Sequence, residues 1–443
     1  MYDSRWTRTW TLTRSLQLED VSTLLFYSSR IREMYFPSQV RPVSLGQLPR
    51  DVPLLAGTML FRQLRALVCI FCKDTTWNVD FVLDKADGLT EMTATIKDPI
   101  DEPTKFMAVM QQRSHHLSLV SFEDRRTEED TRRASIRLFG DLLQGAGSLR
   151  ELHFHAGLQQ YLHIWDVIPA MPLLSRLAFD SDSTVQGPGS PTSYHTLTVV
   201  KMNVLHPRDL SSVLDKVVFP NLCELNLRFY EEVDVISVRH LLSSILSVCP
   251  NPSFKSLRIY STYLFSPFYI FRSRNPDSAE HVLDLSDLRP LMDSYPKLEV
   301  LDLRLQCPWV LGNDDLEAIA RVWGPELTIL RLDPEGGWSR SPTKCITVEG
   351  LEQLASRCPH LTTLGVHFVK TPSLHTPYVV PMYLDRELMQ SSEEPHRLLY
   401  AGSLRKVPPT VKKMRTHLQR LFSGLGKVCS DKTQDEKRRR RLR

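Results

Sequence analysis

Apolar residues recur along most of the chain in the spacing Leu-x-x-Leu-x-Leu. The spacing is unbroken at 222–227, 298–303 and 327–332. Conservative variants begin at Leu149, Leu174, Phe254 and Leu361, and weaker ones at Ile31, Leu64, Leu89, Leu117 and Leu197. The last two apolar positions of each motif are two residues apart, so both side chains point to the same side of a short strand. The pattern therefore predicts a series of strands that each bury one face.

The motifs repeat at a period that suggests one architecture. From Leu64 onward, consecutive motifs begin between 23 and 44 residues apart, and most intervals lie near the period of leucine-rich repeats. A single strand of this kind cannot bury its apolar side alone, whereas stacked repeats share a continuous core. We therefore predict an α/β fold, a leucine-rich-repeat solenoid (horseshoe) with irregular repeats. Its parallel sheet lies on the concave face and its helices on the convex face.

Helical periodicity fills several of the intervals between motifs. Apolar residues share one helix face over 234–248, over 313–323, where Asn313 is a candidate cap, and over 347–358. A proline follows soon after several of these segments, as at Pro250, Pro325 and Pro359, and proline cannot continue a helix. The order strand, loop, helix, proline, strand is what the solenoid requires.

Four regions follow from these patterns. We assign 1–30 to an N-terminal lead-in segment and helix, and 31–370 to the solenoid. Residues 371–425 form a C-terminal loop and capping helix, the helix being a basic amphipathic stretch over 408–422. Residues 426–443 form a basic disordered tail.

Composition and charge narrow the possible partners. Hydrophobic residues make up 42% and charged residues 24% of the chain, as in globular proteins. From Lys412 to Arg443 there are twelve basic and three acidic residues, so the rest of the chain is mildly acidic. We therefore regard nucleic acid as an unlikely partner for the body, because binding phosphate backbones needs clustered positive charge. No apolar run approaches the length of a membrane span, so we expect no membrane partner. Eight cysteines do not form a disulfide framework in a chain of this length, which favours an intracellular protein.

Two segments carry a family resemblance. The segment 350–366 has the pattern Gly-Leu-x-x-Leu-Ala-x-x-Cys-Pro-x-Leu-x-x-Leu and resembles the cysteine-containing leucine-rich repeat of F-box proteins. The segment 27–34, Tyr-Ser-Ser-Arg-Ile-Arg-Glu-Met, resembles the helix-to-strand passage after the F-box in fungal, basidiomycete-type F-box proteins. From about Leu16 to Gly402 the chain looks like the body of that family. The resemblance implies the substrate-recognition part of an SCF-type ubiquitin ligase.

The sequence departs from the family at its N-terminal end. Only 15 residues precede Leu16, and none of them read Leu-Pro-x-Glu-Leu. We therefore expect that a recognisable F-box is missing. Either the sequence is truncated, or the protein binds partners without delivering them to a ligase. A Skp-type adaptor is expected as a partner only if an F-box exists upstream.

The polar positions of the strands would line the concave face and bind a protein partner of unknown identity. Arg228, Arg258, Arg304 and Arg331 fall on successive strands, which predicts an arginine stripe suited to carboxylate or phosphate groups. The alternative is a solvated sheet face with cross-strand Asp–Arg pairs. The full set of candidates is Glu151, His153, His155, Arg176, Asp180, Lys201, Asn203, Glu224, Asn226, Arg228, Arg258, Tyr260, Asp302, Arg304, Arg331 and Asp333.

Motifs for catalysis and metal binding are incomplete. His153 and His155 lie on one strand face, but two ligands are too few for a structural zinc site. Cys69 and Cys72 have Cys-x-x-Cys spacing without a second pair at a suitable distance. The segment 424–427, Gly-Leu-Gly-Lys, lacks the first glycine and the final Ser/Thr of a phosphate loop. We expect no catalytic residue, no cofactor and no metal, and predict that the chain is not an enzyme.

Two functions remain after these exclusions. The first is a non-enzymatic protein-interaction module, which we expect in the cytoplasm. The alternative is a nucleic-acid-associated nuclear protein that uses the arginine stripe and the basic tail. The candidate nuclear-localisation run in that tail is Lys437, Arg438, Arg439, Arg440, Arg441 and Arg443.

Overall fold

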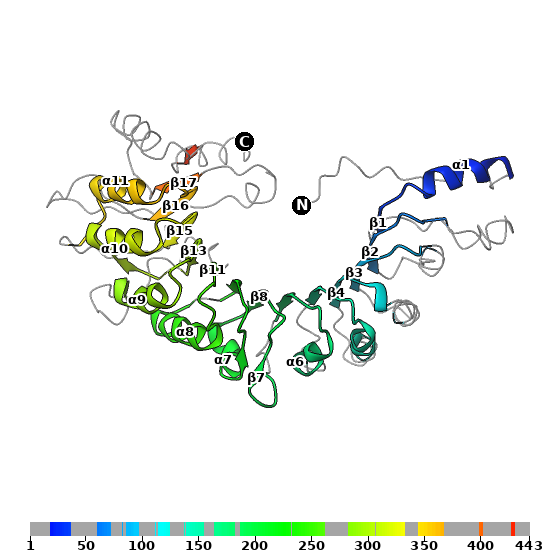
Figure 1. Cartoon of the computed structure of the whole chain (residues 1–443), viewed down its shortest axis with the longest axis horizontal. Helices are drawn as coiled ribbons and strands as arrows, with labels where there is room; N and C mark the ends of the chain where they lie inside the picture. Colours follow the sequence, from blue (N-terminus) through cyan, green and yellow to red (C-terminus); the bar gives the residue numbers. More distant parts are fainter. Residues whose placement is uncertain are drawn as a thin grey trace, which may run out of the picture. The chain divides into compact units, whose positions relative to one another are not determined.

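The computed structural model divides into two compact units, residues 1–189 (unit 1) and 190–443 (unit 2) (Figure 1). The structure describes residues 18–36, 60–71, 86–96, 114–124, 139–154, 164–181, 187–231, 233–261, 282–305, 307–332, 344–366, 398–401 and 427–429, together with Val82, Gln111 and Arg137. No helix within these residues is long and apolar enough to span a membrane.

Unit 1 is built on parallel strands that follow one another in chain order. They are β1 (Glu33–Phe36), β2 (Ala66–Phe71), β3 (Glu91–Ile96), β4 (Leu119–Asp124), β5 (Glu151–Phe154) and β6 (Arg176–Asp180). Helix α1 (Leu18–Ser28) precedes β1, the 3-10 turn η4 (Ser114–His116) precedes β4, and α6 (Ile164–Val167) with η6 (Ile168–Ala170) precedes β6. The helix expected in the first 30 residues is thus present.

Unit 2 continues the same plan with longer helices. Its parallel strands are β8 (Val199–Val204), β10 (Glu224–Phe229), β11 (Ser256–Ser261), β13 (Val300–Arg304), β15 (Ile329–Leu332), β16 (Thr363–Val366), β17 (Leu398–Ala401) and β18 (Lys427–Cys429). The helical segments are η7 (Pro207–Leu210), α7 (Ser211–Leu214), α8 (Val235–Val248), α9 (Leu285–Ser294), α10 (Asn313–Trp323) and α11 (Val348–Arg357). Helices α8 to α11 all lie on one side of the strands (Figure 1).

Two short parallel pairs accompany this sheet. Strand β7 (Thr192–Ser193) pairs with β9 (Val217–Val218), and β12 (Leu283–Asp284) pairs with β14 (Trp309–Val310). These short strands lie in the connections between the main strands, where the Leu-x-x-Leu-x-Leu pattern gives no signal for a strand.

Alternating burial along the strands matches the predicted period. Leu225, Leu227, Leu301 and Leu303 are all at most 1% exposed, while Asn226 between the first two is half-buried. The apolar side faces the helices, and burial of apolar surface there stabilises the fold. The described chain is therefore a mixed α/β protein with a large parallel sheet, as the coarse prediction states.

One backbone arrangement recurs at the start of nearly every described strand. The carbonyl of Cys223 accepts hydrogen bonds from the N–H groups of Lys255 and Ser256, at 2.8 and 3.0 Å. The carbonyls of Lys255 and Glu299 accept the same pair from the next strand, and Arg32, Arg65, Thr90, Ser118 and Arg150 do so in unit 1. The hydroxyls of Thr328 and Thr362 add a third bond to such carbonyls. This bridge therefore joins the start of each of these strands to the start of the next strand.

Helix boundaries agree with the predicted segments, except for one cap. Asp234 caps α8 by accepting from the N–H of Ser237 at 2.8 Å. Asn313, by contrast, is the first residue of α10 rather than its cap, and the carboxylate of Asp315 accepts from the N–H of Gly312 instead. The Asn313 amide is used between helices, because it bonds the N–H and hydroxyl of Thr347 before α11. A Cβ at Gly350 would collide with Asn313 Oδ1, so glycine permits this close approach.

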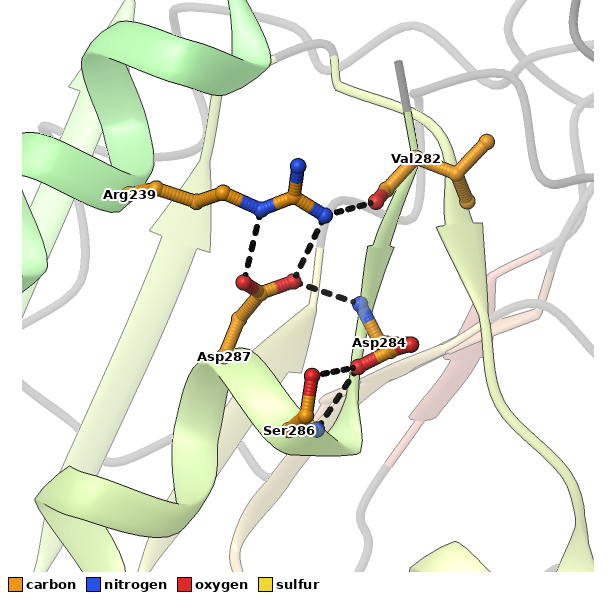
Figure 2. A network of polar contacts seen from close by, with 5 residues as sticks. All are labelled: Arg239, Val282, Asp284, Ser286 and Asp287. Carbon is orange, nitrogen blue, oxygen red and sulfur yellow. Dashed lines mark hydrogen bonds and ion pairs between the residues drawn. The ribbon is translucent and has the colours of Figure 1, made fainter. Parts of the chain in front are cut away.

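A polar network ties α8 to α9 (Figure 2). Arg239 of α8 donates through Nε to Asp287 Oδ1 at 2.8 Å and through Nη2 to the carbonyl of Val282, also at 2.8 Å. The other oxygen of Asp287 accepts from the N–H of Asp284, which caps α9 and bonds Ser286. One guanidinium therefore fixes the start of α9 against the preceding helix.

Buried aromatic residues link the ends of successive helices. Trp323 closes α10 and donates through Nε1 to the carbonyl of Tyr295, which follows α9. The hydroxyl of Tyr295 in turn donates to the carbonyl of Cys249, which follows α8, at 2.8 Å. These bonds satisfy helix-end carbonyls that would otherwise be buried without a partner.

Strands β17 and β18 differ from the prediction for the end of the chain. The sequence predicts a loop around β17 and a disordered tail over β18, yet Leu398–Ala401 pairs in parallel with β16, and Lys427–Cys429 pairs with β17. Pairing of this kind satisfies the backbone groups that an edge strand leaves open. The helix predicted over 408–422 lies outside the described residues.

Candidate interaction surface

The sheet side opposite the helices holds the predicted partner-binding positions, and we call it the open face. Unit 1 carries Glu151, His153, Arg176 and Asp180 on it. Unit 2 carries Lys201, Asn203, Glu224, Asn226, Arg228, Arg258, Tyr260, Asp302, Arg304 and Arg331. His155, Asp333 and the run Lys437, Arg438, Arg439, Arg440, Arg441 and Arg443 lie outside the described residues.

The contacts of Glu151 on the open face of unit 1 are partly exposed to solvent. His153 Nε2 lies 2.8 Å from Glu151 Oε1 on the same strand, and Arg176 lies 4.0 Å from the other oxygen of Glu151. The side chains of His153 and Arg176 are 38% and 60% exposed. Ion pairs at such exposure contribute little to stability.

On unit 2, the four arginines form two rows rather than one stripe. Strand register places Asn226, Arg258, Asp302 and Arg331 side by side on β10, β11, β13 and β15. The neighbouring row runs Arg228, Tyr260, Arg304. Lys201 and Asn203 of β8 extend the two rows, since they pair with Asn226 and Arg228. The register pairs equivalent motif positions: Arg258 and Arg331 lie between the last two apolar residues of their motifs, whereas Arg228 and Arg304 follow them.

The prediction that Asp302 binds a partner is wrong. Its side chain is 0% exposed, because Arg304 Nε bonds Oδ1 at 2.9 Å and Arg331 Nη1 bonds Oδ2 at 3.0 Å. Both arginines are themselves largely buried, at 13% and 11% exposure. Asp302 therefore cannot contact a partner and instead orients two guanidiniums. Of these two pairs, Asp302–Arg331 is a cross-strand Asp–Arg pair of the kind that the alternative expects, but it is buried rather than solvated, and Arg304 lies on the same strand as Asp302.

Tyr260 stands between two arginines. The guanidinium carbon of Arg304 lies 4.9 Å from the ring centroid and that of Arg228 lies 5.9 Å from it. Arg228 also lies 5.5 Å from the ring of Tyr230, a residue that the strand period does not identify because it follows the end of β10. Cation–π contacts of this kind hold the arginines in place.

Strand β10 carries two buried polar atoms without a hydrogen-bonding partner in the described chain, and charged side chains without an ion pair lie beside them. Asn226 Oδ1 and Arg228 Nε are buried without a hydrogen-bonding partner. Within the same described residues, Lys201, Glu224 and Arg258 form no ion pair. Buried polar groups are normally paired, but these two atoms are covered, so the accessible groups of this part of the face are the charged side chains of Lys201, Glu224 and Arg258.

The candidate cysteine and histidine sites show no arrangement for metal or redox chemistry in the described chain. Cys69 is fully buried on β2, where burial raises the pKa of its thiol, and Cys72 lies outside the described residues. No cluster of three possible metal ligands occurs among the described residues. No family model and no curated protein matches the chain.

Proposed function

We propose that this chain is a leucine-rich-repeat protein-interaction module without catalytic activity of its own. In this proposal the helices lie on the convex side of a horseshoe, and the open face of the strands holds a protein partner. The chain would serve as the substrate-recognition part of an F-box protein of fungal, basidiomycete type. Ubiquitin transfer would be performed by other subunits of an SCF-type ligase.

The repeated backbone bridge at the strand starts supports the repeat architecture. The same carbonyl accepts from two successive N–H groups of the next strand, over Cys223, Lys255 and Glu299. Such nearest-neighbour coupling is typical of solenoid proteins, where each repeat contacts only its neighbours. The resemblance of 350–366 to F-box repeats supports the same proposal.

One observation carries the functional part of the proposal, namely the fixed polar surface of unit 2. Asp302 and Tyr260 hold Arg228, Arg304 and Arg331 in defined positions. Side chains that are ordered before binding lose less conformational entropy when a partner arrives.

Affinity purification with mass spectrometry tests the proposal. We would compare the full chain with K201A/R258A, which removes two open-face cations. The matched control R289A/K297A also removes two exposed cations, Arg289 from helix α9 and Lys297 from the turn before β13. We expect the wild type and the control to retain the same partners, and K201A/R258A to lose them. Retention of every partner by K201A/R258A would refute the proposal.

A further inference from the structure

The unpaired part of the unit 2 open face lies on three neighbouring strands. It comprises Lys201, Asn226, Arg228, Arg258 and Tyr260, and we call it the β8–β11 cluster. Neighbouring strands are about 4.8 Å apart, so a single extended segment can contact all three. We propose that the β8–β11 cluster binds an acidic peptide segment of the partner through its carboxylates, an inference that rests on the proposed function.

Charge complementarity favours an anion at the centre of this cluster. Arg258 sits between Asn226 and Asp302 in the strand register, but both oxygens of Asp302 are bonded to Arg304 and Arg331. Arg258 and Lys201 are therefore left with uncompensated positive charge. Glu224 lies one row nearer the strand start and forms no ion pair with either of them in the described structure. A carboxylate between Lys201 and Arg258 would supply the missing counter-charge.

The strand order places the cations of this cluster within reach of one extended segment. Lys201 is exposed on β8, Arg258 is half-buried on β11, and Arg228 is half-buried on β10 between these strands. Side chains at alternate positions of an extended peptide point to the same side. Carboxylates at such positions can therefore face successive cations of the cluster.

Single-stranded nucleic acid fits this cluster less well. Proteins bind such strands with exposed aromatic rings on which bases stack. In the β8–β11 cluster, the ring of Tyr260 is flanked by the guanidiniums of Arg228 and Arg304. The aromatic ring is therefore engaged by cations, and Glu224 lies close by to repel a continuous phosphate backbone.

Fluorescence anisotropy with defined probes tests the inference on the full chain. The probes are a labelled Glu-Gly repeat peptide, a Gln-Gly peptide of the same length and a poly-dT oligonucleotide. We expect the Glu-Gly peptide to bind, and R258A to weaken its binding about tenfold or more through loss of a charge-assisted bond. R289A should leave its affinity unchanged. Equal binding of the Gln-Gly peptide, or tighter binding of poly-dT, would overturn the inference.

The outcomes separate this inference from the proposed function. If no acidic peptide binds, yet K201A/R258A loses its cellular partners, the face binds partners of another chemistry and only this inference fails. If K201A/R258A retains all partners, the proposed function fails, whatever the peptide does.

Discussion

Within the strands of unit 1, the open face carries the carboxylates Glu33, Glu91, Glu123, Glu151 and Asp180 against one guanidinium, that of Arg176. From β8 to β15 in unit 2, it carries the cations Lys201, Arg228, Arg258, Arg304 and Arg331 against Glu224 and Asp302. Both faces follow from the same strand period, so the period determines where polar residues lie but not their charge.

The two faces also differ in how their contacts are held. Glu151 bonds an exposed histidine on its own strand, whereas Asp302 is wholly buried between arginines of its own and the next strand. Exposed pairs can rearrange with little cost, while a buried charge must keep its partners. The arginines around Asp302 are therefore ordered before a partner binds, whereas the contacts of Glu151 in unit 1 are hydrated.

Removal of the Asp302 carboxylate should have the largest effect. D302A leaves Arg304 and Arg331 largely buried without a counter-charge, and we expect a loss of about 3–5 kcal/mol in unfolding free energy. Urea denaturation of the full chain measures it, with E151A as the matched control. A loss below about 1 kcal/mol for D302A would show that the buried contacts of Asp302 stabilise the protein no more than the exposed contacts of Glu151 do.

Most of the strands and helices could be predicted from the sequence, whereas the burial of the ion pairs on the open face could not. The strands around Leu225 and Leu301 and the helices α8, α10 and α11 follow from local periodicity. The motif places Asp302 and Arg331 at equivalent positions of neighbouring strands, as the register confirms, but it does not show that Arg304 and Arg331 cover the carboxylate. The role of Asn313 was missed because its partner Thr347 is 34 positions away.

Disruption of the link between α8 and α9 should have an intermediate effect. R239A removes the bonds to Asp287 and to the carbonyl of Val282. Since the Arg239 side chain is 36% exposed, we expect a loss of only about 1–2 kcal/mol. The measurement is again urea denaturation. R289A, on the exposed side of α9, should change the unfolding free energy by less than about 0.5 kcal/mol.

Acid should weaken unit 2 through its helix caps. Burial raises the pKa values of Asp234 and Asp284, but hydrogen bonds from Ser237 and Ser286 outweigh this and hold both pKa values below the ordinary range. Each carboxylate thus adds stability that is fully present above the unfolded pKa and is lost as pH falls through the folded value. Hydrogen exchange of the α8 and α9 amides should quicken below about pH 4.

The double variant D234N/D284N isolates this effect of acid. Asparagine can still cap a helix but does not ionise in this range. Exchange at α8 and α9 should therefore depend less on pH in the variant than in the wild type. An identical pH dependence in both proteins would mean that other carboxylates are responsible.

Loss of the exposed ion pair in unit 1 should have the smallest effect. R176A removes a contact of 4.0 Å at a side chain that is 60% exposed. We expect the unfolding free energy to change by less than about 0.5 kcal/mol, and high salt to leave that difference near zero. A loss as large as that of R239A would contradict a hydrated face in unit 1.

Photo-crosslinking tests most directly whether the open face of unit 2 is the binding surface. A photoreactive amino acid would replace either Lys201, which is exposed on the open face, or Ser243, which is exposed on helix α8. We predict that the partners retained in affinity purification crosslink from position 201 and not from position 243. Crosslinking from position 243 alone would place the partner on the helices and contradict the proposed function.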